Sequence, residues 1–83
     1  MKIPVRYFAS VREALGKSDE TVETATATLA ALRDELIGRG EPYASALARG
    51  KAVRMALDHT MTAETEALRD GVEVAFFPPV TGG

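Results

Sequence analysis

His59 is the only histidine of the chain, and it directly follows Asp58. A hydroxyl nucleophile beside this pair would have to come from Ser10, Ser18 or Ser45. Serine, histidine and aspartate can form a catalytic triad, but the sequence lacks the strand, G-x-S-x-G turn and helix that often present such a serine. A lone histidine in a turn is more often a solvated turn residue. The sequence therefore predicts no catalysis by His59.

The remaining polar residues give no stronger catalytic or metal site. Glu64, Glu66 and Asp70 flank one loop and would hold a cation only weakly, so solvated charge is the simpler interpretation. No glycine belongs to the G-x-x-x-x-G-K pattern that cradles phosphate. The chain contains no cysteine, which excludes a thiol nucleophile, a thiolate metal site and a disulfide. We expect no side-chain active site, no metal site and no bound cofactor.

The C-terminus offers a different kind of reactive group. Two prolines end the last strand and stiffen its exit, because proline lacks an N–H and fixes its own φ. Two uncharged residues follow, and two glycines without a Cβ let another protein close around the backbone. Fully extended, the segment reaches roughly 20 Å, so it would present its final carboxylate; the alternative is an ordinary frayed terminus. The segment consists of Pro78, Pro79, Val80, Thr81, Gly82 and Gly83.

Two aromatic residues have the side-chain parity of the outer face of a sheet. Phe8 alternates out of phase with Ile3 and Val5, and Phe77 alternates out of phase with Val74. If the first and last strands are neighbours, both rings form an exposed apolar patch beside the exit of the tail. The alternative is that each ring is partly covered by its own loop. Two aromatics at one place favour a partner interface.

The apolar spacing of segment 28–40 predicts the main helix. Thr28 can cap its N-terminus, Gly38 or Gly40 ends it, and Glu35 with Arg39 would form an i,i+4 ion pair. One amphipathic stripe needs one partner surface, and a sheet face is the natural one. The stripe consists of Leu29, Leu32, Leu36 and Ile37.

The other segments predict strands around this helix, and the whole forms an α+β domain over residues 1–77 with 78–83 as an extended tail. Ser10 is expected to cap a short helix over 10–16, and Gly16 is expected to end it. Turns are expected at Asp58-His59 and at Arg69-Asp70-Gly71. The expected strands are 2–9, 18–24, 52–57, 60–64 and 72–77, with an irregular or short helical connection over 41–50.

Composition narrows the class of protein further. The chain has 83 residues, which is room for one small domain, and a net charge of −2, which argues against nucleic-acid binding. It has no apolar run long enough to cross a membrane and no signal-peptide pattern after Met1. We expect a cytoplasmic protein that binds neither nucleic acid nor membrane.

Two stretches resemble one known family. The C-terminus, Asp-Gly-Val-Glu-Val-Ala followed by Phe-Phe-Pro-Pro-Val-Thr-Gly-Gly over 70–83, looks very like that of the molybdopterin synthase small subunits. The stretch Tyr-Phe-Ala-Ser-Val-Arg-Glu-Ala-Leu-Gly over 7–16 is similar to the first strand and short helix of that family. The resemblance implies a ubiquitin-like β-grasp fold, in which a mixed sheet packs on one main helix.

The resemblance also implies a function, namely sulfur carriage for molybdenum cofactor synthesis. An adenylyltransferase related to ubiquitin-activating enzymes would use ATP to adenylate the carboxylate of Gly83, and a sulfur donor would convert it to a thiocarboxylate. The tail would insert into the large subunit of a heterotetramer of two small and two large subunits and give its sulfur to precursor Z (cyclic pyranopterin monophosphate). The chain would therefore be a non-catalytic subunit of a sulfurtransferase complex.

The resemblance assigns residues as well. Gly83 carries the sulfur, Gly82 passes the constriction, and Pro79, Val80 and Thr81 belong to the inserted tail. By position, the contact surface for the partner consists of Phe8, Met61 and Phe77, with Arg12 as a nearby basic residue. The family often has Asn at the turn after the third strand, where this chain has Asp58, so the role of that side chain stays open.

Two other functions stay open at this stage. A ubiquitin-like sulfur carrier can instead serve thiamine synthesis or tRNA thiolation. A ubiquitin-like modifier would use the same activation to join Gly83 to lysines of other proteins. The Phe-Phe-Pro-Pro-Val-Thr-Gly-Gly ending favours the molybdopterin pathway.

Overall fold

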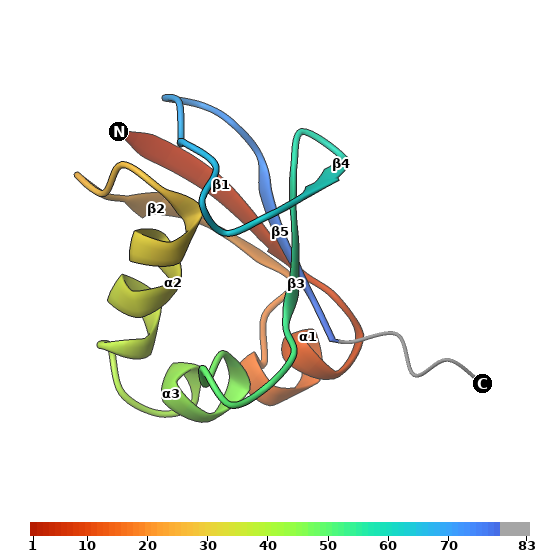
Figure 1. Cartoon of the computed structure of the whole chain (residues 1–83). Helices are drawn as coiled ribbons and strands as arrows, with labels where there is room; N and C mark the ends of the chain where they lie inside the picture. The colour runs from red at the N-terminus through yellow and green to blue at the C-terminus, as the bar shows by residue number, and fades with distance from the viewer. Residues whose placement is uncertain (79–83) are drawn as a thin grey trace.

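The computed structural model describes residues 1–78, which form one five-stranded mixed sheet and three helices (Figure 1). The strand order is β2-β1-β5-β3-β4, with β1 and β5 parallel and every other pair antiparallel. The predicted α+β arrangement is confirmed. In chain order the elements are β1 (Lys2–Tyr7), α1 (Ala9–Leu15), β2 (Asp19–Glu23), α2 (Leu29–Ile37), α3 (Tyr43–Ala46), β3 (Arg54–Leu57), β4 (Thr60–Thr62) and β5 (Val74–Phe77).

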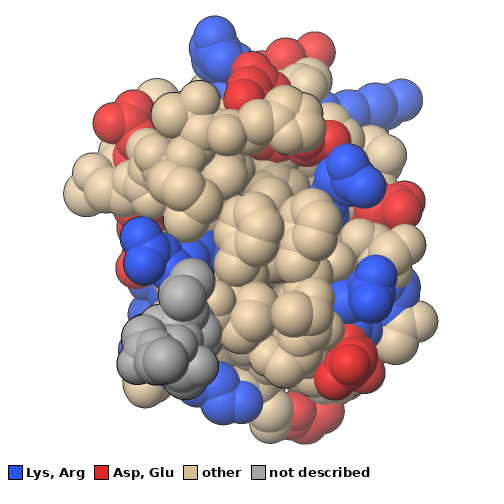
Figure 2. All heavy atoms as spheres, turned by 90° about the vertical axis from the view of Figure 1, so that its right-hand side faces the viewer, with Lys and Arg blue, Asp and Glu red and all other residues tan. Residues whose placement is uncertain are grey.

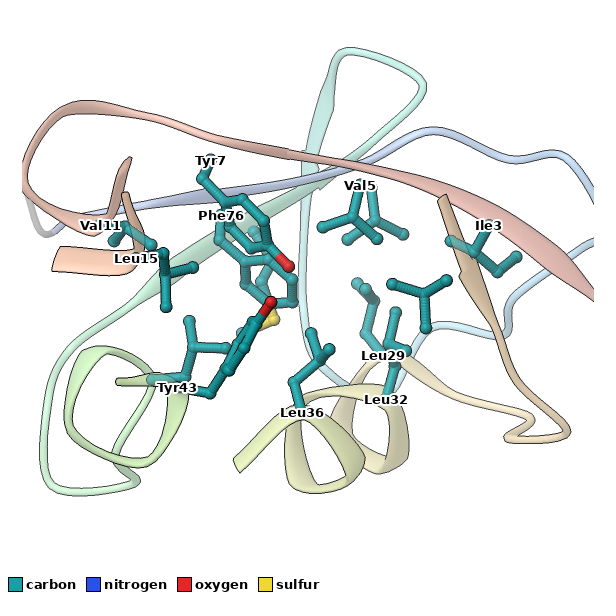
Figure 3. Packing of buried hydrophobic residues seen from close by; sticks show 14 of the residues in the cluster. Ile3, Val5, Tyr7, Val11, Leu15, Leu29, Leu32, Leu36, Tyr43 and Phe76 are labelled. Atoms are coloured by element: carbon teal, nitrogen blue, oxygen red, sulfur yellow. The ribbon is translucent and has the colours of Figure 1, made fainter. Parts of the chain in front are cut away.

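The core lies between α2 and the inner face of the sheet (Figure 3). The predicted stripe of α2 is confirmed, since Leu29, Leu32 and Leu36 are fully buried and Ile37 is partly buried. Residues of β1, β2 and β5 that share one parity cover it, which is the pattern expected of a sheet with one covered face. These sheet residues are Ile3, Val5, Tyr7, Val22, Val74 and Phe76.

The helix ends follow the predicted capping residues in three of four cases, and one of them is Gly38, which ends α2. Thr28 caps α2, where its hydroxyl accepts from the N–H of Ala31 at 3.2 Å. Gly16 ends α1 in the left-handed conformation, with φ 74°, as the capping pattern predicted. The expected cap at Ser10 is wrong, because α1 begins at Ala9 and the extended residue before it is Phe8. Ser10 therefore lies inside the first turn.

The predicted ion pair between Glu35 and Arg39 is also wrong. The α2 helix ends at Ile37, so Arg39 lies past the last helical turn and loses the i,i+4 geometry. Arg39 instead donates to Glu20 of β2 at 2.9 Å. Glu35 accepts from the hydroxyl of Thr24. Both side chains thus join α2 to the β2 region.

Candidate docking surface at the root of the tail

The strand that leads to the C-terminus is the central strand of the sheet. β5 pairs with β1 as far as Phe76 and with β3 as far as Phe77, so both neighbours hold the strand almost to its end. The predicted tail residues beyond this point lie outside the described residues. They are Pro79, Val80, Thr81, Gly82 and Gly83.

The two predicted aromatic residues meet at this end of β5. The rings of Phe8 and Phe77 stack with their centroids 4.7 Å apart and their planes 9° apart. Both side chains are half-buried, and the guanidinium of Arg6 lies 5.5 Å from the centre of the Phe8 ring. The predicted adjacency of the two rings is therefore confirmed. Each ring covers part of the other, which lowers the cost of exposing two aromatics.

A row of short side chains connects the stacked rings with Met61. Ala75 of β5 pairs with Ala56 of β3, and Ala56 pairs with Met61 of β4, so the three side chains share the outer face of the sheet. Both alanines are buried, so they connect the rings to Met61 but expose little surface themselves, whereas Met61 is 49% exposed. We call Phe8, Phe77, Ala75, Ala56 and Met61 the docking surface. Figure 2 shows an uncharged area on this face, bordered by both basic and acidic side chains.

The fourth predicted contact residue, Arg12, lies beside this surface on α1. Its backbone N–H donates to the carbonyl of Phe8 at 3.3 Å, and its side chain is exposed. The structure thus brings Phe8 and Phe77 into contact, places Arg12 next to Phe8, and sets Met61 on the same face two strands away from β5.

The turn between β3 and β4 shows the role of the Asp58 side chain, which the sequence left undecided. Asp58 and His59 both have left-handed φ, 45° and 69°, as two-residue hairpin turns of this hand require. The carboxylate of Asp58 accepts from the N–H of Glu73 at 3.0 Å and pairs with Arg69 at 3.1 Å. Asp58 therefore holds the turn against the chain that enters β5.

The sequence did not indicate the role of Arg33, whose side chain binds the connection between α3 and β3. Its side chain is 3% exposed and donates to the carbonyls of Leu47, Ala48 and Lys51 at 2.8, 2.7 and 3.1 Å. A charged residue inside a helical segment gave no sign of this role, although an arginine one residue after a stripe leucine could have suggested it. Arg33 thus fixes the connection between α3 and β3.

A small cavity of about 120 Å³ opens beside this connection. Pro78 forms part of its wall together with Lys51 and Val53 from the stretch before β3 and with residues of α1. The first residue after β5 therefore rests on two other elements. The α1 residues that line the cavity are Ser10, Val11 and Ala14, and Ala46 of α3 completes it.

The buried ionisable groups lie on the helix side, away from the docking surface. Glu20 accepts from the hydroxyls of Tyr7 and Tyr43 at 2.8 and 2.7 Å, and from Arg39. Burial alone would raise the pKa of Glu20, but these hydrogen bonds outweigh it and lower the pKa to about 2. Burial and then the bond to Glu20 raise the pKa of Tyr7. This cluster stabilises the fold and contains no reactive group.

The residues considered for hydrolytic chemistry do not meet. His59 has an 80% exposed side chain, and its Nε2 lies 3.1 Å from the carboxylate of Glu73. Ser18 and Ser45 hydrogen-bond to Asp19 and Glu41 instead. Within residues 1–78, no three His, Asp or Glu side chains lie close enough together to hold a metal ion. In the same part of the chain, none of the helices has the length and apolar character needed to cross a membrane.

The fold defines the class of protein as a β-grasp domain, in which a mixed sheet folds around one main helix and ends in a central strand. The sequence pattern of the ThiS family matches residues 5–83, and the chain belongs to that family.

Relatives of similar length carry two kinds of name. The molybdopterin synthase sulfur carrier subunit of Escherichia coli is 42% identical over 81 residues, which cover 98% of this chain and 99% of the relative. The subunit of the same name from Haemophilus influenzae is 40% identical over 79 residues, covering 95% and 96%. Small archaeal modifier protein 3 of Haloferax volcanii is 37% identical over 97 residues, covering both chains fully.

Solved structures share the fold over the whole chain. The crystal structure of SAMP1 from Haloferax volcanii has a TM-score of 0.77 at 26% identity, covering 100% of both chains. A chain of the complex of subunits 1 and 2 of molybdopterin-converting factor from Helicobacter pylori has a TM-score of 0.68 at 24% identity, again covering 100% of both chains.

Proposed function

We propose that the chain is the sulfur carrier subunit of a molybdopterin synthase. The observation that carries the proposal is the similarity, at 40% and 42% identity and almost full length, to two relatives of that name. The geometry of the described residues supports it. An apolar docking surface lies at the end of a central strand, and the chain continues from there to two terminal glycines.

In this proposal residues 1–77 are the folded domain and residues 78–83 are the part that carries sulfur. Adenylation turns the carboxylate of Gly83 into an acyl-adenylate, whose AMP is a good leaving group. A sulfur donor displaces AMP and leaves a thiocarboxylate on Gly83. Gly82 lets the backbone pass a constriction of the partner, and Pro79, Val80 and Thr81 form the rest of the inserted segment. The chemistry uses the backbone terminus, so the chain needs no cysteine.

The proposal names the partners. The large synthase subunit would receive the tail and pass its sulfur to precursor Z, in a heterotetramer of two small and two large subunits. A ubiquitin-activating-like adenylyltransferase would use ATP to adenylate the terminal carboxylate of the tail. We infer a cytoplasmic location for the protein, because this reaction consumes ATP. Phe8, Phe77 and Met61 would contact these partners through their exposed apolar atoms, and Arg12 would contact them beside Phe8.

The test is an intact-mass measurement after incubation with the activating enzyme, ATP and a sulfur source. We expect the exchange of one oxygen for one sulfur, confined to the C-terminal peptide. The matched control is a chain without Gly83, which keeps the docking surface but moves the carboxylate to Gly82. If that chain exchanges oxygen for sulfur as fast as the full chain, the assignment of Gly83 is wrong.

A second function, protein modification, is favoured by the 37% identity to Small archaeal modifier protein 3 of Haloferax volcanii. A modifier would use the same activated Gly83 but transfer it to lysine amines, which gives isopeptide bonds. Such conjugates survive thiol and hydroxylamine treatment, whereas a thioester does not. A stable ladder of conjugates in lysate would establish modification, and co-purification of a larger partner without a ladder supports sulfur carriage alone.

A further inference from the structure

The basic side chains of the protein divide into two groups. Most of the 10 Lys and Arg residues form ion pairs with carboxylates of the described chain. Four of them form no ion pair with any of residues 1–78, although all four are exposed. These four are Lys2, Arg12, Lys51 and Arg54.

Three of the four lie at the root of the tail. Arg54 pairs directly with Phe77 across β3 and β5, on the outer face. Lys51 lines the same cavity as Pro78. Arg12 lies in the first turns of α1, where its backbone N–H donates to the carbonyl of Phe8, the residue that precedes the helix. Lys2 lies at the opposite end of β1 from Tyr7, which is roughly 16 Å along the strand. We call Arg12, Lys51 and Arg54 the basic collar.

The backbone holds the collar in place before any partner arrives. Arg54 belongs to β3, between two other strands. The carbonyl of Lys51 accepts from Arg33 at 3.1 Å and from the N–H of Val53 at 2.8 Å. Binding a partner therefore costs the rotamer freedom of these long side chains but needs no ordering of the backbone that carries Lys51 and Arg54.

The charge of the collar is opposite in sign to that of the whole protein. The net charge is −2, and on the helix side three carboxylates already pair with cations. Glu20 pairs with Arg39, while Asp34 and Glu64 pair with Arg49. Beside the exposed apolar surface, the three cations of the collar form no ion pair within residues 1–78, although α1 also carries the exposed carboxylate of Glu13 next to Arg12. An apolar centre with a charged rim is the usual anatomy of a protein interface.

We propose that the basic collar recognises acidic side chains on the large synthase subunit, around the opening through which the tail enters. This inference rests on the proposed function. A protein surface fits better than a nucleotide or free phosphate, because the collar spreads over α1, the stretch before β3, and β3 itself. The cavity that Lys51 lines measures about 120 Å³, below the range of about 300–1,000 Å³ for small-molecule pockets, and the larger hollow of about 590 Å³ beside Arg54 and Met61 is wide open to solvent.

A collar of this kind acts mainly on the rate of association. Complementary charges raise that rate from about 10⁵–10⁶ to as much as about 10⁸ M⁻¹s⁻¹ at low salt. Salt screens the effect, since the Debye length is about 8 Å at physiological ionic strength. The collar would therefore guide the carrier so that the tail faces the opening at the moment of contact.

The test measures association of the full-length carrier with the large synthase subunit by stopped flow, from about 0.01 M to about 1 M ionic strength. We expect Arg54→Glu and Lys51→Glu each to slow association about tenfold at low salt, and Arg54→Gln to slow it by less. The matched control is Lys2→Glu, which makes the same change of net charge away from the collar, and should leave the rate nearly unchanged.

Several outcomes would overturn the inference. One is a wild-type rate that does not depend on salt; another is an equal effect of Lys2→Glu and Arg54→Glu, which would mean that only net charge matters. A third is unchanged association in Arg54→Glu together with weaker binding of ATP or inorganic phosphate. Circular dichroism checks that each variant folds. If Arg54→Glu does not fold, Lys51→Glu replaces it in the comparison with Lys2→Glu. If the wild-type carrier neither binds the large subunit nor gains sulfur at Gly83, the proposed function itself fails.

Discussion

At the scale of single residues, the docking surface depends on one pair of rings. Phe77 ends β5 and Phe8 directly follows β1, two strands that are far apart in the sequence and parallel in the sheet, and the planes of the two rings differ by only 9°. Neither ring is part of the core that α2 covers. Their packing can therefore be changed without opening that core.

We predict that Phe77→Asp weakens binding of the large subunit by at least about tenfold, because interface aromatics commonly contribute more than 1 kcal/mol when truncated. The fold should remain, with a loss of about 0.5–1.5 kcal/mol for the stacked pair. Isothermal titration calorimetry measures the affinity and urea unfolding measures the stability. The matched control is Thr65→Asp, which adds the same charge at an exposed position outside the docking surface. Unaltered binding by Phe77→Asp would refute the role of the surface.

The turn residue Asp58 allows a finer test, because its two carboxylate oxygens have different partners. Asp58→Asn keeps an acceptor for the N–H of Glu73 and tolerates the left-handed φ, but loses the exposed ion pair with Arg69. We expect a loss below about 0.5 kcal/mol for Asn and about 1–2 kcal/mol for Asp58→Ala, which loses the exposed bond to Glu73 and strains alanine at a left-handed φ. Equal losses in urea unfolding would show that the bond to Glu73 contributes little.

At the scale of secondary-structure elements, two polar contacts connect the helices to the rest of the fold. Arg33 ties α2 to the connection that follows α3, and Glu20 ties β2 to α3 through Tyr43. Both side chains face the interior from positions that the apolar pattern does not mark. Helix α3 has only four residues and would not be stable alone. These contacts therefore decide where the chain between α2 and β3 lies.

We predict that Arg33→Met costs about 2–4 kcal/mol of unfolding free energy, because three carbonyls lose their donor and the aliphatic replacement offers none. Arg33→Lys should recover only part of it, since one ammonium cannot reach all three in the geometry of a guanidinium. The control is Arg49→Met on the same side of the molecule, whose ion pairs are exposed. A similar loss in both variants would contradict the special role of Arg33.

Glu20 predicts how stability depends on pH. Its pKa is about 2 in the folded protein and 4.5 without the fold, so its ionised form is favoured by folding. The stabilisation is complete above about pH 4.5 and is lost as the pH falls toward 2, and it amounts to about 2–3 kcal/mol. Urea midpoints of the wild type should fall steeply across this range, and those of Glu20→Gln should fall less. Parallel pH curves would mean that other carboxylates dominate.

At the scale of the whole molecule, we expect stability to depend on the folded domain and sulfur acceptance to depend on the tail. Residues 1–78, the part of the chain that the structure describes, contain the core, the ion pairs and the five strands. We predict that a chain ending at Pro78 unfolds within about 0.5 kcal/mol of the full chain and has no sulfur-accepting activity. Urea unfolding and the mass measurement test the two parts separately. A large loss of stability would show that residues 79–83 belong to the folded domain.

Much of this architecture could be predicted from the sequence, for physical reasons that differ between elements. The stripe of α2, the Thr28 cap and the Gly16 end depend on local spacing, and the side of Phe8 and Phe77 depends on strand alternation. Arg33 and Glu20 could not be found in this way, because the partners described above lie 13 to 23 residues away. Helix α1 begins at Ala9 and not within the expected range 10–16, because Phe8, which has an extended backbone, is its N-cap residue.

The central position of β5 has a mechanical consequence. A partner that grips the tail and draws it inward pulls along the axis of β5, which is paired with β1 on one edge and β3 on the other. Such a load shears both ladders at once, so their hydrogen bonds must break together instead of opening one by one from an end. If the proposed insertion of the tail takes place, we expect the domain to withstand the pull without unravelling from the end that is pulled.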